Sequence, residues 1–202
     1  MFTKITRVAA MVSCALAAST VFAAYPEKPI TVVVPFAAGG PTDVVARTLS
    51  QAMGTQLKGS MIVENAGGAG GTIGAGKVAR AAGDGYTLLF HHIGMSTAPS
   101  LYRKLDFKPL EDFIPIGAVV DVPMTLIAKP QTTQTNAKDL LAYIRANKEK
   151  INLANAGVGS ASHLCGLLLQ NAMKTDLTTV PFSGTGPAMT ALLGGNVDIM
   201  CD

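Results

Sequence analysis

Short runs of β-branched apolar residues alternate along this chain with longer segments whose apolar residues recur at helical spacing. Residues 30–34 read ITVVV, an almost continuous apolar run that is typical of a strand buried in a parallel sheet. Residues 42–53 follow with Val45, Leu49 and Met53 four positions apart, on one face of a helix. This alternation predicts an α/β fold in which helices cover doubly wound parallel sheets.

The alternation continues in two blocks that a change of pattern separates. In the first block we expect further strands at residues 61–63 and 86–91 and a helix at 70–82. Two strand-like runs, 114–120 and 124–128, then lie on either side of Pro123 and indicate a crossover. In the second block we expect helices at 137–147, 160–173 and 186–193, and strands at 151–154, 177–181 and 197–200. The sequence therefore predicts two lobes, residues 24–122 and 123–202.

Three glycine-containing turns share one design, in which a strand ends and a helix begins. They read PFAAGGPTD at 35–43, NAGVGSASH at 155–163 and PFSGTGPAM at 181–189, and none contains Lys or Arg. The first N–H groups of a helix lack partners and carry partial positive charge, so such ends bind carboxylate or phosphate without a basic side chain. The alternative is that these are ordinary turns in which Thr42 and Ser160 only cap helices.

The most glycine-rich run, ENAGGAGGTIGAG at 64–76, does not match a nucleotide-binding motif. Ile73 stands where a dinucleotide-binding loop that starts at Gly68 and Gly70 needs its third glycine, and no G-K-[ST] follows. We interpret the run as a turn followed by tight helix packing.

The first 23 residues have the pattern of a secretory signal peptide. Lys4 and Arg7 precede an apolar stretch at 8–18, and the small residues before Ala23 predict cleavage after it. We therefore expect an exported protein. Cys14 follows residues that match a lipidation motif poorly, and whether it is lipidated stays open.

Charge and cysteine content exclude several classes of function. Without Lys4 and Arg7, fourteen of the 16 basic residues remain against 13 acidic ones, so no basic stripe for nucleic acid is expected. Cys165 and Cys201 remain after the leader, without C-x-x-C spacing. In an oxidising compartment such a pair is more typical of a disulfide than of a metal or redox site. We expect no metal and no cofactor.

Catalytic motifs are also missing. Ser160 and Ser162 lie next to His163, but there is no G-x-S-x-G turn, so an exported serine hydrolase is the weaker hypothesis and we expect no enzyme. His91 and His92 end an expected strand, where neighbours point to opposite faces and cannot bind one metal together. We expect one of them, His91, to face a ligand.

Five segments together resemble one protein family. They read YPEKPITVVVPFAAGGPTDVVAR, VENAGGAGGTIGAGKVARAAGDGYTLL, DFIPIGAVVDVPMTLIA, NAGVGSASHLCG and VPFSGTGPAMTALLGGNVDIMCD. They resemble the receptors of tripartite tricarboxylate transporters, the Bug-type periplasmic solute-binding proteins. The resemblance implies a two-lobed type II periplasmic-binding-protein fold that closes on a small carboxylic acid. In that family backbone amides and ordered waters hold the carboxylate, and the receptor presents it to membrane permease subunits.

The resemblance also assigns ligand-binding positions, motif by motif. They are Ala38, Gly39, Gly40, Thr42 and Asp43 in the first lobe, Gly159, Ser160 and Ala161 in the second, Gly184, Thr185 and Gly186 in the third turn, and Asp202 at the pocket wall. We expect Asp43 to cap its own helix or to meet an ammonium group of an amino-acid ligand. Family members continue past the position of Asp202 and complete the first lobe, so we expect this chain to be truncated.

The resemblance leaves open whether the receptor serves transport or a sensor. A receptor that presents its ligand to a sensor needs the same ligand trap as one that serves transport. The expected partners are a small carboxylate and the permease subunits, with no nucleic acid, and the protein is expected to be a monomer.

Overall fold

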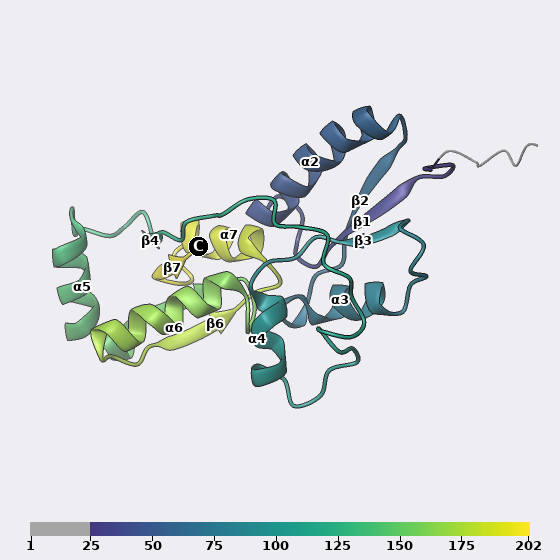
Figure 1. Cartoon of the computed structure of the whole chain (residues 1–202). Helices are drawn as coiled ribbons and strands as arrows, with labels where there is room; N and C mark the ends of the chain where they lie inside the picture. Colours follow the sequence, from purple (N-terminus) through teal and green to yellow (C-terminus); the bar gives the residue numbers. More distant parts are fainter. Residues whose placement is uncertain (1–24) are drawn as a thin grey trace, which may run out of the picture.

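The computed structural model describes residues 25–202, in which two separate β-sheets carry helices on their faces (Figure 1). The expected signal peptide and Cys14 lie outside the described residues. Within the described part, no helix is both long and apolar enough to cross a membrane.

The first sheet has three parallel strands in the order β2-β1-β3. Its central strand contributes Val32 and Val34 to a core that also holds Phe36 and Ala46, which explains the β-branched run in the sequence. The elements of this part are β1 (Ile30–Val34), α2 (Pro41–Leu57), β2 (Met61–Asn65), η1 (Ala69–Gly71), α3 (Thr72–Ala79), β3 (Thr87–Leu89) and α4 (Gly94–Leu101).

The second sheet has four strands in the order β4-β7-β5-β6, of which only β4 is antiparallel to its neighbour. Its elements are β4 (Leu126–Ala128), α5 (Ala137–Ala146), η2 (Lys148–Lys150), β5 (Asn152–Asn155), α6 (Ala161–Met173), β6 (Thr178–Pro181), α7 (Thr185–Leu193) and β7 (Ile199–Cys201). Helices α5, α6 and α7 each begin within two residues of their expected positions.

The central strands β5 and β7 of the second sheet are buried on both faces. Leu153 and Ile199 pack into one apolar cluster, whereas the next residues, Ala154 and Met200, pack into another. Adjacent strand residues point to opposite faces, so a strand between two layers of helices has apolar residues at consecutive positions in its centre. This explains why β5 and β7 do not show polar alternation.

The disulfide expected from the cysteine count is present in the structure. Cys165 in α6 is bonded to Cys201 in β7, with 5.8 Å between their Cα atoms. The bond connects a helix to the strand that it covers.

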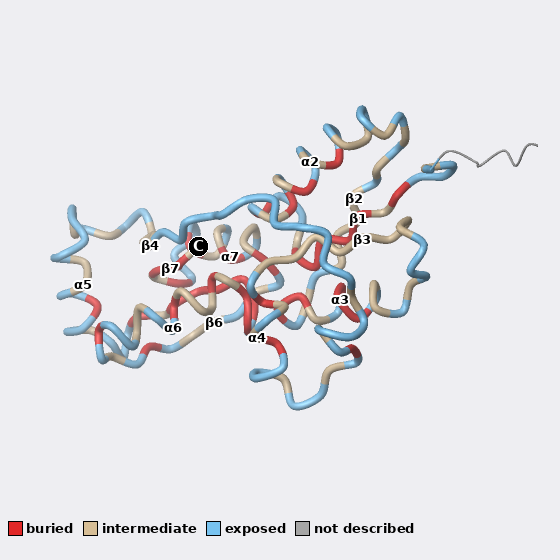
Figure 2. The backbone as a smooth tube through the Cα atoms, viewed as in Figure 1, coloured by how far each residue is buried: buried red, intermediate tan, exposed pale blue. Residues whose placement is uncertain are grey.

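Two sequence expectations are corrected here. Residues 114–120 are not a strand: Ile114 and Ile116 are 92% and 83% exposed, and within residues 25–202 no strand pairs with them (Figure 2). A β-branched composition fits a strand, but a strand also needs a hydrogen-bonding neighbour. The second correction is α4, which was not expected; it contains Pro99 and starts two residues after His92, where the histidine pair was expected to end a strand.

Candidate ligand-binding cleft

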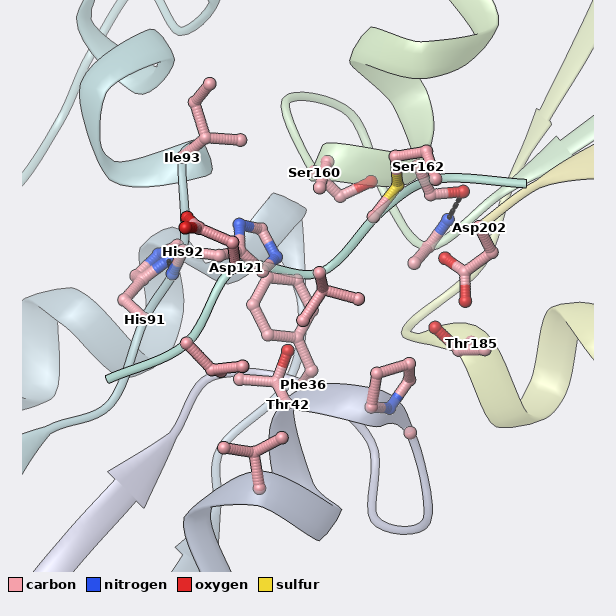
Figure 3. Close-up of a pocket in the computed structure, with 18 of the residues that line it drawn as sticks. Phe36, Thr42, His91, His92, Ile93, Asp121, Ser160, Ser162, Thr185 and Asp202 are labelled. Carbon is pink, nitrogen blue, oxygen red and sulfur yellow. Dashed lines mark hydrogen bonds between the residues drawn. The ribbon is translucent and has the colours of Figure 1, made fainter. Parts of the chain in front are cut away.

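A cavity of about 630 Å³ lies between the two sheets, at the carboxyl ends of their strands (Figure 3). This is where open parallel sheets bind ligands. The residues that line it come from both halves of the chain: Phe36, Gly40, Pro41, Thr42, Val45, Leu89, Phe90, His91, His92, Ile93, Gly117, Ala118, Val119, Val120, Asp121, Val122, Met124, Ala156, Ser160, Ala161, Ser162, Leu164, Cys165, Leu168, Thr185 and Asp202.

Three helices begin at this cavity, and their starts explain the glycine-containing turns. Gly40 precedes α2, Ser160 precedes α6 and Gly184 precedes α7. Ser160 is an N-cap in extended conformation whose hydroxyl accepts a 3.1 Å hydrogen bond from the amide of His163. The first turn of each helix carries N–H groups without helical partners, so three positive dipole ends meet at one cavity.

The cavity brings together about half of the residues expected to bind a ligand. Those that line it are Gly40, Thr42, His91, Ser160, Ala161, Thr185 and Asp202. Those that do not line it are Ala38, Gly39, Asp43, Gly159, Gly184 and Gly186.

Asp43 is part of a buried network instead. Its carboxylate accepts 2.9 Å hydrogen bonds from the amide of Gly39, from Nε of Arg47 and from Nδ2 of Asn65. Burial raises the pKa of Asp43, but the hydrogen bonds from Arg47, Gly39 and Asn65 outweigh it, so the pKa lies below its usual value. The carboxylate therefore fixes the shape of the turn at the start of α2, and Asp43 does not line the cavity.

Several of the other glycines lie where the two lobes touch. A Cβ on Gly184 would lie 2.8 Å from the backbone N of Ala37, and that amide donates a 3.3 Å hydrogen bond to the carbonyl of Ser183. The carbonyl of Gly159 accepts a 3.2 Å hydrogen bond from the Thr97 hydroxyl. These glycines permit close approach of two backbones, a requirement that looks the same in sequence as a ligand turn.

The glycine run at 64–76 has a similar explanation. A Cβ on Gly74 would lie 2.7 Å from Cβ of Pro35, and a Cβ on Gly70 would lie 1.8 Å from the Val158 carbonyl oxygen. Tyr102 donates a 2.6 Å hydrogen bond from its hydroxyl to the same carbonyl. The interpretation as a turn with tight packing agrees with these contacts, and part of the packing is against the other lobe.

Both histidines line the cavity, which corrects the expectation that they point to opposite faces. Strand β3 ends at Leu89, so His91 and His92 lie in a loop, with 5.1 Å between their ring centroids. Phe36 stacks on His92 at 4.4 Å and meets His91 edge-on at 5.6 Å. Nδ1 of His91 accepts a hydrogen bond from the amide of His92, and Nδ1 of His92 accepts one from Gly94.

The charge of these rings decides how the cavity can hold an anion. Burial, together with the neighbouring His92, lowers the pKa of His91 to about 3, and burial lowers the pKa of His92 to about 4. Both rings are therefore neutral at neutral pH and carry hydrogen on Nε2. In residues 25–202 no Lys or Arg lines the cavity, and no three His, Cys, Asp or Glu side chains are grouped as metal ligands.

Asp202 lies in the cavity wall beside the hydroxyls of Ser162 and Thr185 (Figure 3). Burial raises its pKa, and the nearby hydroxyls of Thr185 and Ser162 lower it by less, so that the net direction is upward. Its backbone pairs with Thr125 through N···O distances of 2.8 and 3.0 Å.

The sequence reasoning did not identify Ser162, Phe36 or the segment 117–124 as cavity wall. Ser162 is 2% exposed, and its hydroxyl accepts a 3.3 Å hydrogen bond from the amide of Ala156. Its position in the first turn of α6, next to Ala161, is the signal that could have identified it. Residues 117–120 were expected to belong to a strand because of their apolar composition, and they line the cavity instead.

The hydroxyls of Ser160 and Ser162, the two candidates for a hydrolase nucleophile, both accept hydrogen bonds from backbone amides. Ser160 accepts from the amide of His163, and Nδ1 of His163 accepts a 3.2 Å hydrogen bond from the amide of Gly159. Among residues 25–202, no hydrogen bond joins the His163 ring to Ser160 or Ser162. The geometry does not support a serine nucleophile with an adjacent base.

Comparison with known proteins agrees with the fold. Residues 45–202 match the family described as tripartite tricarboxylate transporter family receptor. A protein from the TAR-I ttuE-ttuC' intergenic region of Agrobacterium vitis is 47% identical over 88% of this chain and 51% of its own length. BugT of Bordetella pertussis is 38% identical over 86% of this chain and 54% of its own length. The chain thus spans about half the length of these curated relatives.

Solved structures give the same result. The periplasmic binding protein BugD superposes with a TM-score of 0.85 and 56% identity, over 88% of this chain and 60% of BugD. MatC from Rhodopseudomonas palustris, with bound malate, superposes with a TM-score of 0.82 and 44% identity, over 88% of this chain and 61% of MatC. A second R. palustris protein, with adipate, has a TM-score of 0.84 and 30% identity, over 88% and 60% of the two chains.

The two-lobed α/β fold, the cleft at its strand ends and these matches lead to one assignment: the chain belongs to the family of tripartite tricarboxylate transporter receptors, which includes periplasmic binding proteins of the Bug type.

Proposed function

We propose that this protein is a periplasmic receptor that captures a small carboxylic acid in the cleft and delivers it to the permease subunits of a tripartite transporter. Residues 1–23 direct its export in this proposal, and the protein acts as a monomer. The two lobes, residues 24–122 and 123–202, close on the ligand, and no catalytic step is required.

The observation that carries the proposal is that three helix starts meet at a cavity whose described wall has no cationic side chain. Such an arrangement holds an anion through backbone N–H groups and hydroxyls, which give charge-assisted hydrogen bonds. A volume of about 630 Å³ suits a small molecule. The malate in MatC and the adipate in the second R. palustris protein support a carboxylate as the ligand.

The binding step is tested by thermal unfolding with mono- and dicarboxylates from three to six carbons. A ligand that binds only the folded state raises stability with concentration, by about 2.7 kcal/mol at one hundred times its Kd. The matching amides have the same shape without the charge, and we expect them to give no shift. Equal shifts with acids and amides, or none with any acid at millimolar concentration, would contradict the proposal.

The delivery step is tested in cells. Deleting the gene should abolish uptake of the labelled carboxylate identified above, and restoring it should recover uptake. Normal uptake with loss of a transcriptional response to the same acid would instead support a sensor role.

A further inference from the structure

The cleft that is proposed to bind an anion also has acidic side chains in its wall. Asp121 and Asp202 are the acidic side chains in the described wall, and no described Lys or Arg lines the wall to balance them. His91 and His92 are neutral at neutral pH because burial keeps their pKa values at about 3 and about 4. A ligand that offers only carboxylates would therefore be repelled by a carboxylate in the wall.

Asp202 cannot easily turn away from the ligand. Its amide donates to the carbonyl of Thr125 at 3.0 Å, and its own carbonyl accepts from the amide and the hydroxyl of Thr125 at 2.8 and 2.9 Å. The preceding residue, Cys201, is bonded to Cys165 in α6. The backbone at Asp202 is thus tied on one side to β4 and on the other to the helix whose first turn lines the cleft.

The hydroxyls beside Asp202 leave acceptor capacity on its carboxylate. Ser162 and Thr185 both lie against it, one from the start of α6 and one from the start of α7. A carboxylate has about four acceptor positions, and these two hydroxyls occupy at most two. The positions that remain face a cavity and are best satisfied by a donor on the ligand itself.

We propose that Asp202 is a specificity-determining residue that selects carboxylic acids bearing a hydrogen-bond donor, a hydroxyl or an ammonium group, over unsubstituted acids. The helix starts hold the ligand's carboxylate and Asp202 accepts from its donor. This inference rests on the proposed function and refines the class of ligand.

The test uses ligands that differ by one group, with binding measured by calorimetry at neutral pH. Succinate, malate and aspartate share a four-carbon diacid skeleton and carry H, OH and NH₃⁺ at one carbon. The same comparison is made with propionate, lactate and alanine, and with glutarate, 2-hydroxyglutarate and glutamate, in both enantiomers where these exist. We expect at least about tenfold tighter binding of a hydroxy or amino acid than of its unsubstituted parent, as for one hydrogen bond to a charged group.

The variant Asp202→Asn measures how much this residue, and not the rest of the cleft, contributes to the ligand preference. It should reduce the ratio of affinities to within about threefold, while the unsubstituted acid binds as well or better because the repulsion is removed. Asp176→Asn makes the same change of charge at an exposed position in the same lobe and should leave the ratio unchanged. Tighter binding of the amino acids would assign an ammonium partner to Asp202, and tighter binding of the hydroxy acids a hydroxyl partner.

The outcomes distinguish the two proposals. If carboxylates bind but parents and substituted acids bind equally, the role of Asp202 is overturned and the receptor function stands. If a preference exists but Asp202→Asn retains it, with an unfolding transition like that of the unmodified protein, another residue makes the selection. If no acid in any series binds, the receptor function itself fails. The ligand series on the unmodified protein decides the preference even if Asp202→Asn does not fold.

Discussion

The carboxylate of Asp43 accepts a 2.9 Å hydrogen bond from the backbone amide of Gly39, four residues before it. One amide of the first glycine turn is therefore used inside the protein and is not free for a ligand. Asn65 adds a second support, because its Nδ2 donates both to Asp43 and to the carbonyl of Phe36, at 2.9 and 3.1 Å. The turn has its shape before a ligand arrives, which reduces the ordering cost of binding.

Asp43→Ala should lower the free energy of unfolding by about 2–4 kcal/mol, because it leaves the Gly39 amide and the Asn65 amide group without their buried acceptor. Urea unfolding measures this. The control is Glu111→Ala, which removes a 2.7 Å ion pair with Lys108 at the surface and should cost at most about 1 kcal/mol. Equal losses for the two variants would contradict the structural role of Asp43.

Gly40→Val should weaken carboxylate binding by at least about tenfold with little loss of stability. Gly40 has φ −78°, so another residue adopts this backbone without strain, and a Cβ would lie 3.5 Å from Cβ of Thr185, an ordinary contact. The two methyl groups beyond it would occupy space at the start of α2 that the anion needs. Gly83→Val, at an open surface position, is the control, and calorimetry with the identified acid measures both.

Ser160→Ala should lower both stability and affinity. The hydroxyl caps α6 by accepting from His163, so its loss costs about 1 kcal/mol of stability. The hydroxyl hydrogen of Ser160 remains available to a ligand in the cavity, so the binding free energy should weaken by about 1–2 kcal/mol as well.

Thr42→Ala should weaken the binding free energy by the same amount with a smaller effect on folding, since Gly40, and not Thr42, is the N-cap of α2. Calorimetry and urea unfolding on both variants test the distinction.

Removing the disulfide with Cys165→Ala and Cys201→Ala together should lower the free energy of unfolding by about 4 kcal/mol on the chain-entropy model, given a sequence separation of 36. Unfolding of the unmodified protein in excess reductant should show the same loss. Reductant should have no further effect on the double variant. A reductant-insensitive unmodified protein would show that the two thiols are not bonded in solution.

Stability should decrease as the pH falls below about 6.5. The unfolded chain binds protons at His91 and His92 near pH 6.5, whereas the folded protein holds their pKa values at about 3 and about 4. The unfolded state therefore binds more protons in this window, and each histidine contributes a slope of about 1.4 kcal/mol per pH unit, with stability rising as pH rises. Above pH 6.5 both states are neutral at these rings and the contribution vanishes.

His92→Gln tests this, because glutamine keeps a polar side chain and does not titrate. Its free energy of unfolding, measured by urea between about pH 5 and pH 6.5, should vary less steeply than that of the unmodified protein by about 1.4 kcal/mol per pH unit. Parallel profiles for the two proteins would mean that His92 titrates normally in the folded state.

Local patterns in the sequence determined most of the secondary structure. The run ITVVV became β1, Asn136 capped α5 by accepting a 3.0 Å hydrogen bond from the amide of Asp139, and Pro41 marked the first turn of α2. These features depend on residues within a few positions of each other, so the sequence contains their cause. The two cysteines predicted a disulfide for a different reason, because no third cysteine competes in the described chain.

Only the tertiary structure decided which polar and glycine residues face the cleft. A glycine that admits a ligand and a glycine that admits another backbone look alike in sequence, and Gly40 proved to line the cavity whereas Gly184 contacts Ala37. Asp43 belongs to the same sequence motif as Gly40, but its carboxylate is hydrogen-bonded to Asn65, 22 residues away, and does not line the cavity. Residues 114–120 had the composition of a strand, but strand formation depends on a partner that the local sequence does not contain. Such contacts join residues far apart along the chain, and for that reason the three-dimensional arrangement alone determines them.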